Sequence, residues 1–274
     1  MKITNIKNVI IASLLILNVF FLAFCLMHLL EDGQSREDRH QTLEALVKKN
    51  GMTLDVAGLE EGGVLHTLKT SRDTAGEAAM AKALLGETTV QEQGGSVTYS
   101  GQNGQAVFNN GGDFNVTFQT GVVHADEGKA VIMIQKLLKT LDIETSSLEA
   151  APDGGKVVVT AVSAYKGTPI LNCRLIFTFQ NGSLVSFSGK RVYTLAETEE
   201  KTDMTAASTA VTVLLNAVKT GRVTCTKILA AQPGYLLIAS SAYGDATVRP
   251  IWQLTTDTGV YLYDTQTGNL EPAA

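Results

Sequence analysis

The residues that could do chemistry in this 274-residue chain are few and scattered. His40, His66 and His124 have no Cys, His, Asp or Glu at a metal-ligand spacing, apart from the two acids that follow His124. Those acids, Asp126 and Glu127, are typical of the start of a helix, where the helix dipole favours negative charge. The sequence therefore predicts no metal site.

Motifs of the common enzyme classes are also missing. The chain has no GxGxxG, Walker-type, HExxH, GxSxG or CxxC pattern. Acid pairs such as Glu60-Glu61 and Glu199-Glu200 lie in loop-like segments, and no pattern places two carboxylates across a cleft. We therefore expect no cofactor and a protein that is not an enzyme, with a cell-wall hydrolase as the weakest hypothesis.

Two cysteines form a candidate disulfide. Cys173 and Cys225 each fall in an expected strand, and a bridge between them would close a loop of about 50 residues, which stabilises by roughly 4 kcal/mol on the chain-entropy model. The alternative is two buried free thiols, since a cysteine in a strand is also a small core residue. The sequence leaves both alternatives open.

Composition limits the classes of partner. The chain is 45% hydrophobic and 18% charged, with 22 basic and 27 acidic side chains and a net charge of −5. Nucleic-acid binding is not expected, because phosphate binding needs clustered Lys and Arg. The apolar content is enough for a packed core.

The N-terminal segment predicts a membrane anchor. Residues 9–30 contain no Lys, Arg, Asp or Glu and would span roughly 33 Å as a helix, enough for the hydrocarbon core. Lys2 and Lys7 precede this run, so residues 1–8 are expected in the cytoplasm and the rest of the chain outside. A cleaved signal peptide or a lipoprotein signal at Cys25 is the alternative, but the run is long and lacks a small-x-small cleavage site.

Two polar residues of this run are candidates for contacts with another transmembrane helix. Asn18 lies near its middle, where an amide hydrogen bond across helices contributes roughly 0.5–2 kcal/mol. Cys25 lies nearer the outer end. The alternative is that a strongly apolar helix simply tolerates one Asn.

Beyond the anchor, the hydrophobic pattern changes between helix and strand periodicity. Helices are expected over about 35–50, 74–85, 127–141 and 205–220, the second of them starting with a capping box formed by Thr74 and Glu77. Asn181-Gly182 predicts a type I′ hairpin turn. Strands are expected at 52–56, 88–92, 96–100, 105–109, 113–119, 156–165, 169–180, 183–190, 223–231, 234–241, 247–255 and 259–264.

This order predicts the α+β class, because hairpin-length connections make neighbouring strands antiparallel. The expected architecture is an N-terminal transmembrane helix followed by repeated helix-plus-antiparallel-sheet units. After the transmembrane helix (9–30) and a juxtamembrane helix (31–51), the units cover 52–124, 125–200 and 201–274, the last two as a duplicated domain. The charged segment 196–203 is expected to be the loop between those two.

Three stretches carry a resemblance to a known family. They are the basic start that leads directly into an apolar helix, the Gly-x-Pro-Ile turn at 167–170 ahead of a long hairpin, and the last strands, where Pro-Ile-Trp at 250–252 is followed by Asp-x-x-Thr-Gly at 264–268. With these the chain resembles the YycI/YycH family, single-pass membrane proteins of Gram-positive bacteria. The last stretch is also similar to PepSY-type modules.

The resemblance implies a regulator of a sensor histidine kinase of the WalK type, a two-component system for cell-wall homeostasis. Its implied partners are the kinase, the lipid bilayer and a second, YycH-like accessory membrane protein, and the family has no catalytic residues to transfer. The alternative function is a PepSY-like module that captures a peptide or inhibits a peptidase through exposed sheet edges. In either case we expect Trp252 in the core and Asp264 as the cap of its own turn.

Overall fold

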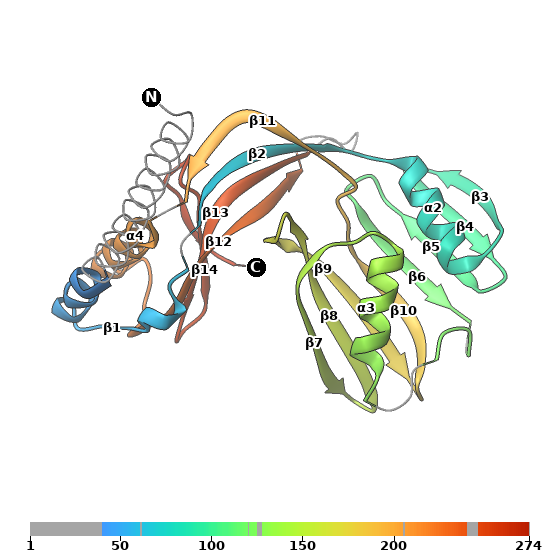
Figure 1. Cartoon of the computed structure of the whole chain (residues 1–274), viewed down its shortest axis with the longest axis horizontal. Coiled ribbons are helices and arrows are strands. Elements are labelled where there is room, and N and C mark those ends of the chain that lie inside the picture. Colours follow the sequence, from blue (N-terminus) through green and yellow to red (C-terminus); the bar gives the residue numbers. More distant parts are fainter. Residues whose placement is uncertain are drawn as a thin grey trace, which may run out of the picture.

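A computed structural model describes residues 40–60, 62–119, 121–124, 128–204, 206–239 and 246–273. The chain forms two lobes, each a twisted sheet with helices packed on one face (Figure 1). We call them the α2–α3 lobe, which contains β3 to β10, and the α4 lobe, which contains β1, β2 and β11 to β15.

The α2–α3 lobe is an eight-stranded antiparallel sheet. Helices α2 (Thr74–Leu85) and α3 (Ala130–Thr140) pack on it. Its strands, in spatial order, are β7 (Thr145–Asp153), β8 (Lys156–Tyr165), β9 (Thr168–Gln180), β10 (Ser183–Lys190), β6 (Asp113–Phe118), β5 (Gly104–Phe108), β4 (Ser96–Gly101) and β3 (Thr88–Gln93).

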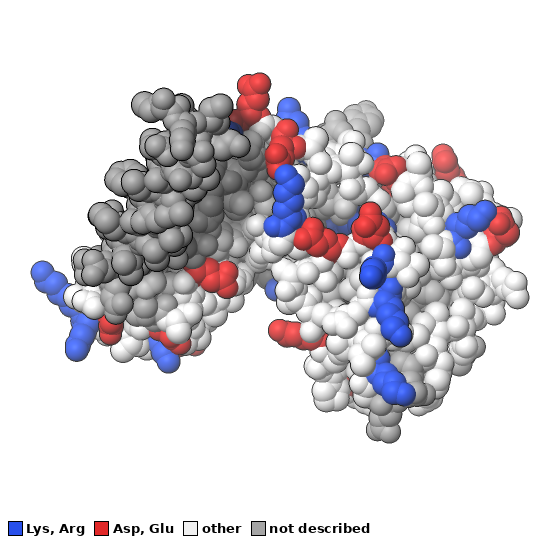
Figure 2. All heavy atoms as spheres, in the orientation of Figure 1, with Lys and Arg blue, Asp and Glu red and all other residues white. Residues whose placement is uncertain are grey.

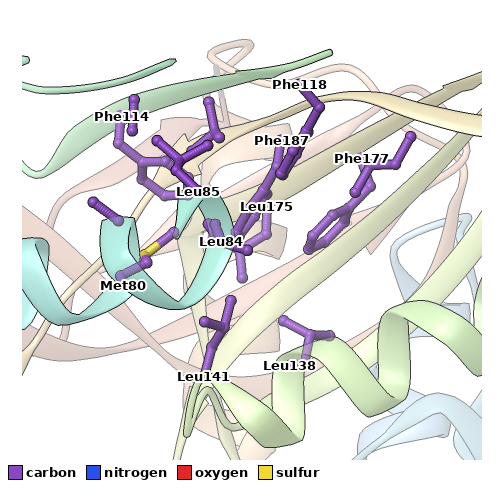
Figure 3. Packing of buried hydrophobic residues seen from close by; sticks show 14 of the residues in the cluster. Met80, Leu84, Leu85, Phe114, Phe118, Leu138, Leu141, Leu175, Phe177 and Phe187 are labelled. Carbon is purple, nitrogen blue, oxygen red and sulfur yellow. The ribbon is translucent and has the colours of Figure 1, made fainter. Parts of the chain in front are cut away.

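Strict alternation of apolar residues directs one face of this sheet toward α2 and α3. In β6, and in β9 from Cys173 to Phe179, every second residue is buried, as the two-residue period of a strand requires. Figure 3 shows Met80 and Leu84 of α2 and Leu138 of α3 against Phe177 and Phe187 of the sheet. The last two rings stack with centroids 4.1 Å apart.

The α4 lobe is a mixed sheet covered by α4 (Ala207–Lys219) and by the helical residues 40–49. Trp252, 1% exposed, lies in its core as the sequence predicts. The strands of the main path are β11 (Thr194–Asp203), β2 (Val64–Ser71), β13 (Ala246–Thr256) and β12 (Lys227–Ala239). Strand β14 (Val260–Tyr263) pairs with β13, and β15 (Leu270–Pro272) pairs with β14. Strand β1 (Thr53–Leu54) and the 3-10 turn η1 (Val56–Gly58) lie alongside β12.

The two lobes join where β9 meets β12. The strands are parallel there, with Ile170 opposite Tyr235. Both side chains lie in a small core cluster with Leu68, Cys173 and Val248. The connections from β2 to α2 and from β10 to β11 also cross between the lobes (Figure 1).

The expected fold class, a transmembrane helix followed by helix-plus-antiparallel-sheet repeats, is contradicted. The molecule is mostly β-structure in one extended mixed sheet: β6 pairs with β10, so the strands that follow α2 and α3 share a sheet, and β12 pairs in parallel with β1 and β9. Turn signals fix neighbours within a hairpin but carry no information on pairing between distant hairpins. None of the helices in the described part of the chain is long and apolar enough to cross a membrane. The predicted span 9–30 lies outside the described residues.

At the level of single elements, the strands expected over 88–119 match β3 to β6, and Asn181 and Gly182 have the positive φ values of 52° and 75° that the turn requires. Elsewhere the prediction is wrong. Segment 196–203, expected as a loop, belongs to strand β11, and the strands expected at 223–231 and 234–241 are the single strand β12.

A candidate binding groove

Each sheet has a face on which no described helix packs, which we call its bare face. In the α2–α3 lobe these are the residues that alternate with the core positions. They are mostly uncharged and polar, among them Thr98, Ser100, Gln105, Asn115, Thr117, Thr160, Thr178, Ser186 and Ser188. In the α4 lobe the register puts Gln232, Gln253 and Leu262 together on the corresponding face.

A groove of about 1230 Å³ lies between the lobes, lined by residues of both bare faces. One wall comes from β7, β8, β9, β10 and the start of β6, and the other from β12 to β15 with Glu60. Its position follows from the fold: both sheets carry their helices on the opposite faces, so the bare faces are free to line it.

The walls combine apolar and amide side chains. Half-buried Leu236 and Leu262 lie on the α4 lobe's wall and Val162 on the opposite one. Gln232 donates a hydrogen bond from Nε2 to Oε1 of Gln253 at 2.8 Å. Such a surface offers both van der Waals contact and hydrogen bonding to an uncharged polar chain.

Charged groups in the groove are few and carry both signs. Lys190 Nζ lies 3.6 Å from Asp113 Oδ2. Arg174 on β9, and Glu60 and Glu271 on the other side, are exposed and make no ion pair with the described residues. Figure 2 likewise shows charges of both signs dispersed over the viewed face of the molecule.

Asn172 of β9, which lines the groove, links this strand to β12 where the two lobes join. Its side-chain amide exchanges two hydrogen bonds with the backbone of Leu237 on β12. Nearby, Gly234 leaves room for the side chain of Leu171, since a Cβ at position 234 would lie 3.1 Å from it. The floor of the groove is therefore built where β9 passes from one sheet to the other.

The ionic groups buried deepest lie outside the groove. Glu77, 2% exposed, accepts two hydrogen bonds from the Arg72 guanidinium, at 2.8 and 2.9 Å, and this interaction raises the pKa of Arg72. Arg72 also bonds Asn110 and the carbonyl of Gly95. The predicted capping box does not form, because Asp73 caps α2 through Gly76 N and Glu77 binds Arg72 instead.

Half-buried Arg191 forms a second anchor, at the connection from β10 to β11. Its Nη2 donates to the carbonyl oxygen of Leu141 at 3.0 Å, and its guanidinium lies 4.4 Å from the ring centre of Tyr193. Burial lowers the pKa of Arg191 and raises that of Tyr193. These contacts attach the connection from β10 to β11 to the end of α3, so the role of Arg191 is to hold these two parts of the fold together.

Of the sequence-predicted site residues, the structure describes Cys173 and Cys225 and does not bring these two together. Cys173 and Cys225 are buried free thiols in different core clusters, and burial raises the pKa of Cys173 to about 12. Asn18 and Cys25 lie outside the described residues. Asp264 caps its own turn as predicted, accepting from the backbone N–H of Gln266 at 2.8 Å.

Only the described residues can be searched for a metal site. Within them, no three His, Cys, Asp or Glu side chains are grouped so that they could hold a metal ion. His66 instead lies with Nδ1 2.8 Å from the carbonyl oxygen of Thr198. The groove was missed from the sequence, and the alternation of Arg174 and Ile176 with buried residues in β9 is the only local signal for its wall.

Comparisons with known proteins give a fold likeness and no family. No family model matches the chain, and no curated protein matches it. The structure is similar to the crystal structure of an uncharacterized protein from Eubacterium rectale ATCC 33656, with a TM-score of 0.53 and 11% sequence identity, over 81% of this chain and 90% of that one. At that identity the likeness concerns the fold alone.

Proposed function

We propose that this protein is a non-catalytic binding protein that captures an extended polypeptide segment in the groove between its two bare sheet faces. The observation that carries the proposal is the groove itself, at about 1230 Å³ and lined by both lobes. Pockets for small molecules typically enclose about 300–1,000 Å³ and bury most of the ligand. A larger groove shared between two sheets suits a chain better than a compact molecule.

The composition of the walls supports the same ligand class. A polypeptide offers backbone amides and alternating side chains, which match the amides of Gln232 and Gln253 and the apolar surfaces of Leu236 and Leu262. Among the described strands, β15 pairs only with β14. Its second edge can add main-chain hydrogen bonds to an extended segment, the usual mode of β-augmentation.

A library of random twelve-residue displayed peptides, selected on the immobilised full chain in mild detergent, tests the proposal. Leu262→Arg places a charge inside the groove, and Val107→Arg places the same charge on the bare face outside it. Selected peptides should bind the wild type and Val107→Arg alike, and Leu262→Arg at least about tenfold more weakly. Equal binding to all three proteins, or no selected peptide, would reject the groove as the site.

The regulatory role implied by the YycI/YycH resemblance stays a prediction, as do its kinase and YycH-like partners and the location outside the cytoplasm. The contacts assigned to that role lie at Asn18 and Cys25, outside the described residues. Affinity purification of the full chain, beside a variant with residues 9–30 scrambled, tests it. A sensor kinase recovered only with the native segment would support the role.

A further inference from the structure

We propose that Arg174 makes the groove selective for an extended segment that carries an aspartate or glutamate side chain. The inference rests on the proposed function and adds the chemistry of the segment. Arg174 lies on the bare face of β9, lines the groove and is exposed. A guanidinium presents a planar fork of donors that matches the two oxygens of a carboxylate.

The side chains of the other described arginines near structural junctions each have a hydrogen-bonding or ionic partner, whereas the Arg174 side chain has none among the described residues. Arg72 binds Glu77 in a bidentate pair, Arg191 donates to Leu141, and Arg249 lies 3.7 Å from Asp264. The Arg174 side chain makes no hydrogen bond or ion pair with any part of the chain that the structure describes. Its donors are therefore available to a ligand in the groove.

The neighbouring cation does not provide an equivalent site. Gly189 pairs with Leu175, so continuing this register places Lys190 opposite Arg174 on the same wall. The Lys190 ammonium lies 3.6 Å from Asp113, which partly compensates its charge. Lys190 keeps the local potential positive, and Arg174 is the cation of this wall that lacks a counter-ion among the described residues.

The carboxylate should come from a side chain within the segment rather than from its C-terminus. The bare face continues past Arg174 along β9 with Ile176, 39% exposed, and Thr178, and across the sheet to Ser188 and Asn115. A segment in the groove can therefore extend over this surface on both sides of Arg174. An acidic residue within it would meet the guanidinium where the segment crosses β9.

The test uses the peptides selected on the full-length wild-type chain, each compared with its Asp→Asn or Glu→Gln analogue and with its C-terminally amidated form. We expect the loss of the side-chain carboxylate to weaken binding about tenfold, as for one charge-assisted contact, and amidation to have little effect. The variant Arg174→Gln should bind the acidic peptide about tenfold more weakly and no longer distinguish it from its amide analogue.

Arg222→Gln is the matched control, because Arg222 is exposed, lies in the turn after α4 and is not among the groove-lining residues. It should bind like the wild type. Thermal unfolding of Arg174→Gln should match the wild type, since no described contact is lost. Equal affinity of the wild type for acidic and amide peptides would overturn the role of Arg174 while leaving peptide capture intact. If only C-terminal amidation weakened binding, the carboxylate bound by Arg174 would be the C-terminus of the peptide, and the proposal of an acidic side chain would be overturned. The absence of any binding peptide would reject the proposed function as well.

Discussion

The side-chain amide of Asn172 substitutes for a strand partner of Leu237: Nδ2 donates to the Leu237 carbonyl oxygen at 2.8 Å, and Oδ1 accepts from the Leu237 N–H at 2.9 Å. Backbone pairing between β9 and β12 is limited to Ile170 and Tyr235. Asn172 thus satisfies backbone groups of β12 where β9 turns away, and it joins the two lobes beside the groove.

Replacing Asn172 with alanine should loosen this junction. Loss of two hydrogen bonds to the backbone predicts a free energy of unfolding lower by about 1 kcal/mol, with faster hydrogen exchange at the Leu237 amide. Asn115→Ala is the control, because Asn115 is exposed and its side chain makes no hydrogen bond to the described residues. Unchanged exchange at Leu237 would contradict the role of Asn172.

The ion pair between Arg72 and Glu77 should be important for stability. Glu77→Gln leaves a nearly buried guanidinium, 14% exposed, without its counter-ion, so the free energy of unfolding should fall by about 3 kcal/mol or more. Glu87→Gln removes the partner of Lys82 from an exposed pair, 66% and 89% accessible, and should have little effect. Chemical denaturation measures both, and similar values for the two variants would be inconsistent with this view.

Asp257 should contribute to the acid sensitivity of the fold. Its pKa is lowered because the Thr226 hydroxyl donates to Oδ2 at 2.5 Å and the Lys227 N–H to Oδ1 at 3.0 Å. A lowered pKa in the folded state means that the contribution is complete above the ordinary value of 3.8 and is lost as the pH falls through the folded value.

The free energy of unfolding of the wild type should thus decrease between about pH 5 and pH 2, and less steeply in Asp257→Asn. Thr226→Val removes the first donor and should also reduce the slope. The same acid dependence in the wild type and both variants would show that Asp257 is not responsible.

The thiols of Cys173 and Cys225 should be unreactive in the native protein. Burial raises the pKa of Cys173 to about 12 and also raises the pKa of Cys225, so little thiolate forms at pH 8 and access is blocked. In a Cys25→Ser background, maleimide should label both only after denaturation. A mass lower by two hydrogens without reductant would instead indicate the disulfide that the sequence left open.

Local features were predictable because they depend on neighbouring residues. The turn at Asn181-Gly182 requires positive φ, which Asn and Gly accept most easily. The alternation in β6 and β9 is the direct consequence of side chains pointing to opposite faces. The burial of Trp252 and the Asp264 turn belong to the same group.

Errors arose where distant segments decide the outcome. Segment 194–203 is charged and mostly exposed, yet it is strand β11 because β2 supplies its backbone partners. The sequence predicted two strands, at 223–231 and 234–241, but pairing with β13 and the fit of Leu171 against Gly234 keep β12 continuous. Propensity is weak compared with such tertiary contacts.

By itself, the sequence determined the approximate position of the helices that the structure describes, most hairpins and the alternation that separates a core face from a bare face, since these depend on the local period and turn chemistry. Only the tertiary structure decided that β6 pairs with β10, that β9 crosses to β12, and that Arg174 and Leu262 line one groove. The physical reason is that strand pairing joins backbone groups far apart in the chain, and apart from proline every residue type offers the same backbone N–H and C=O groups.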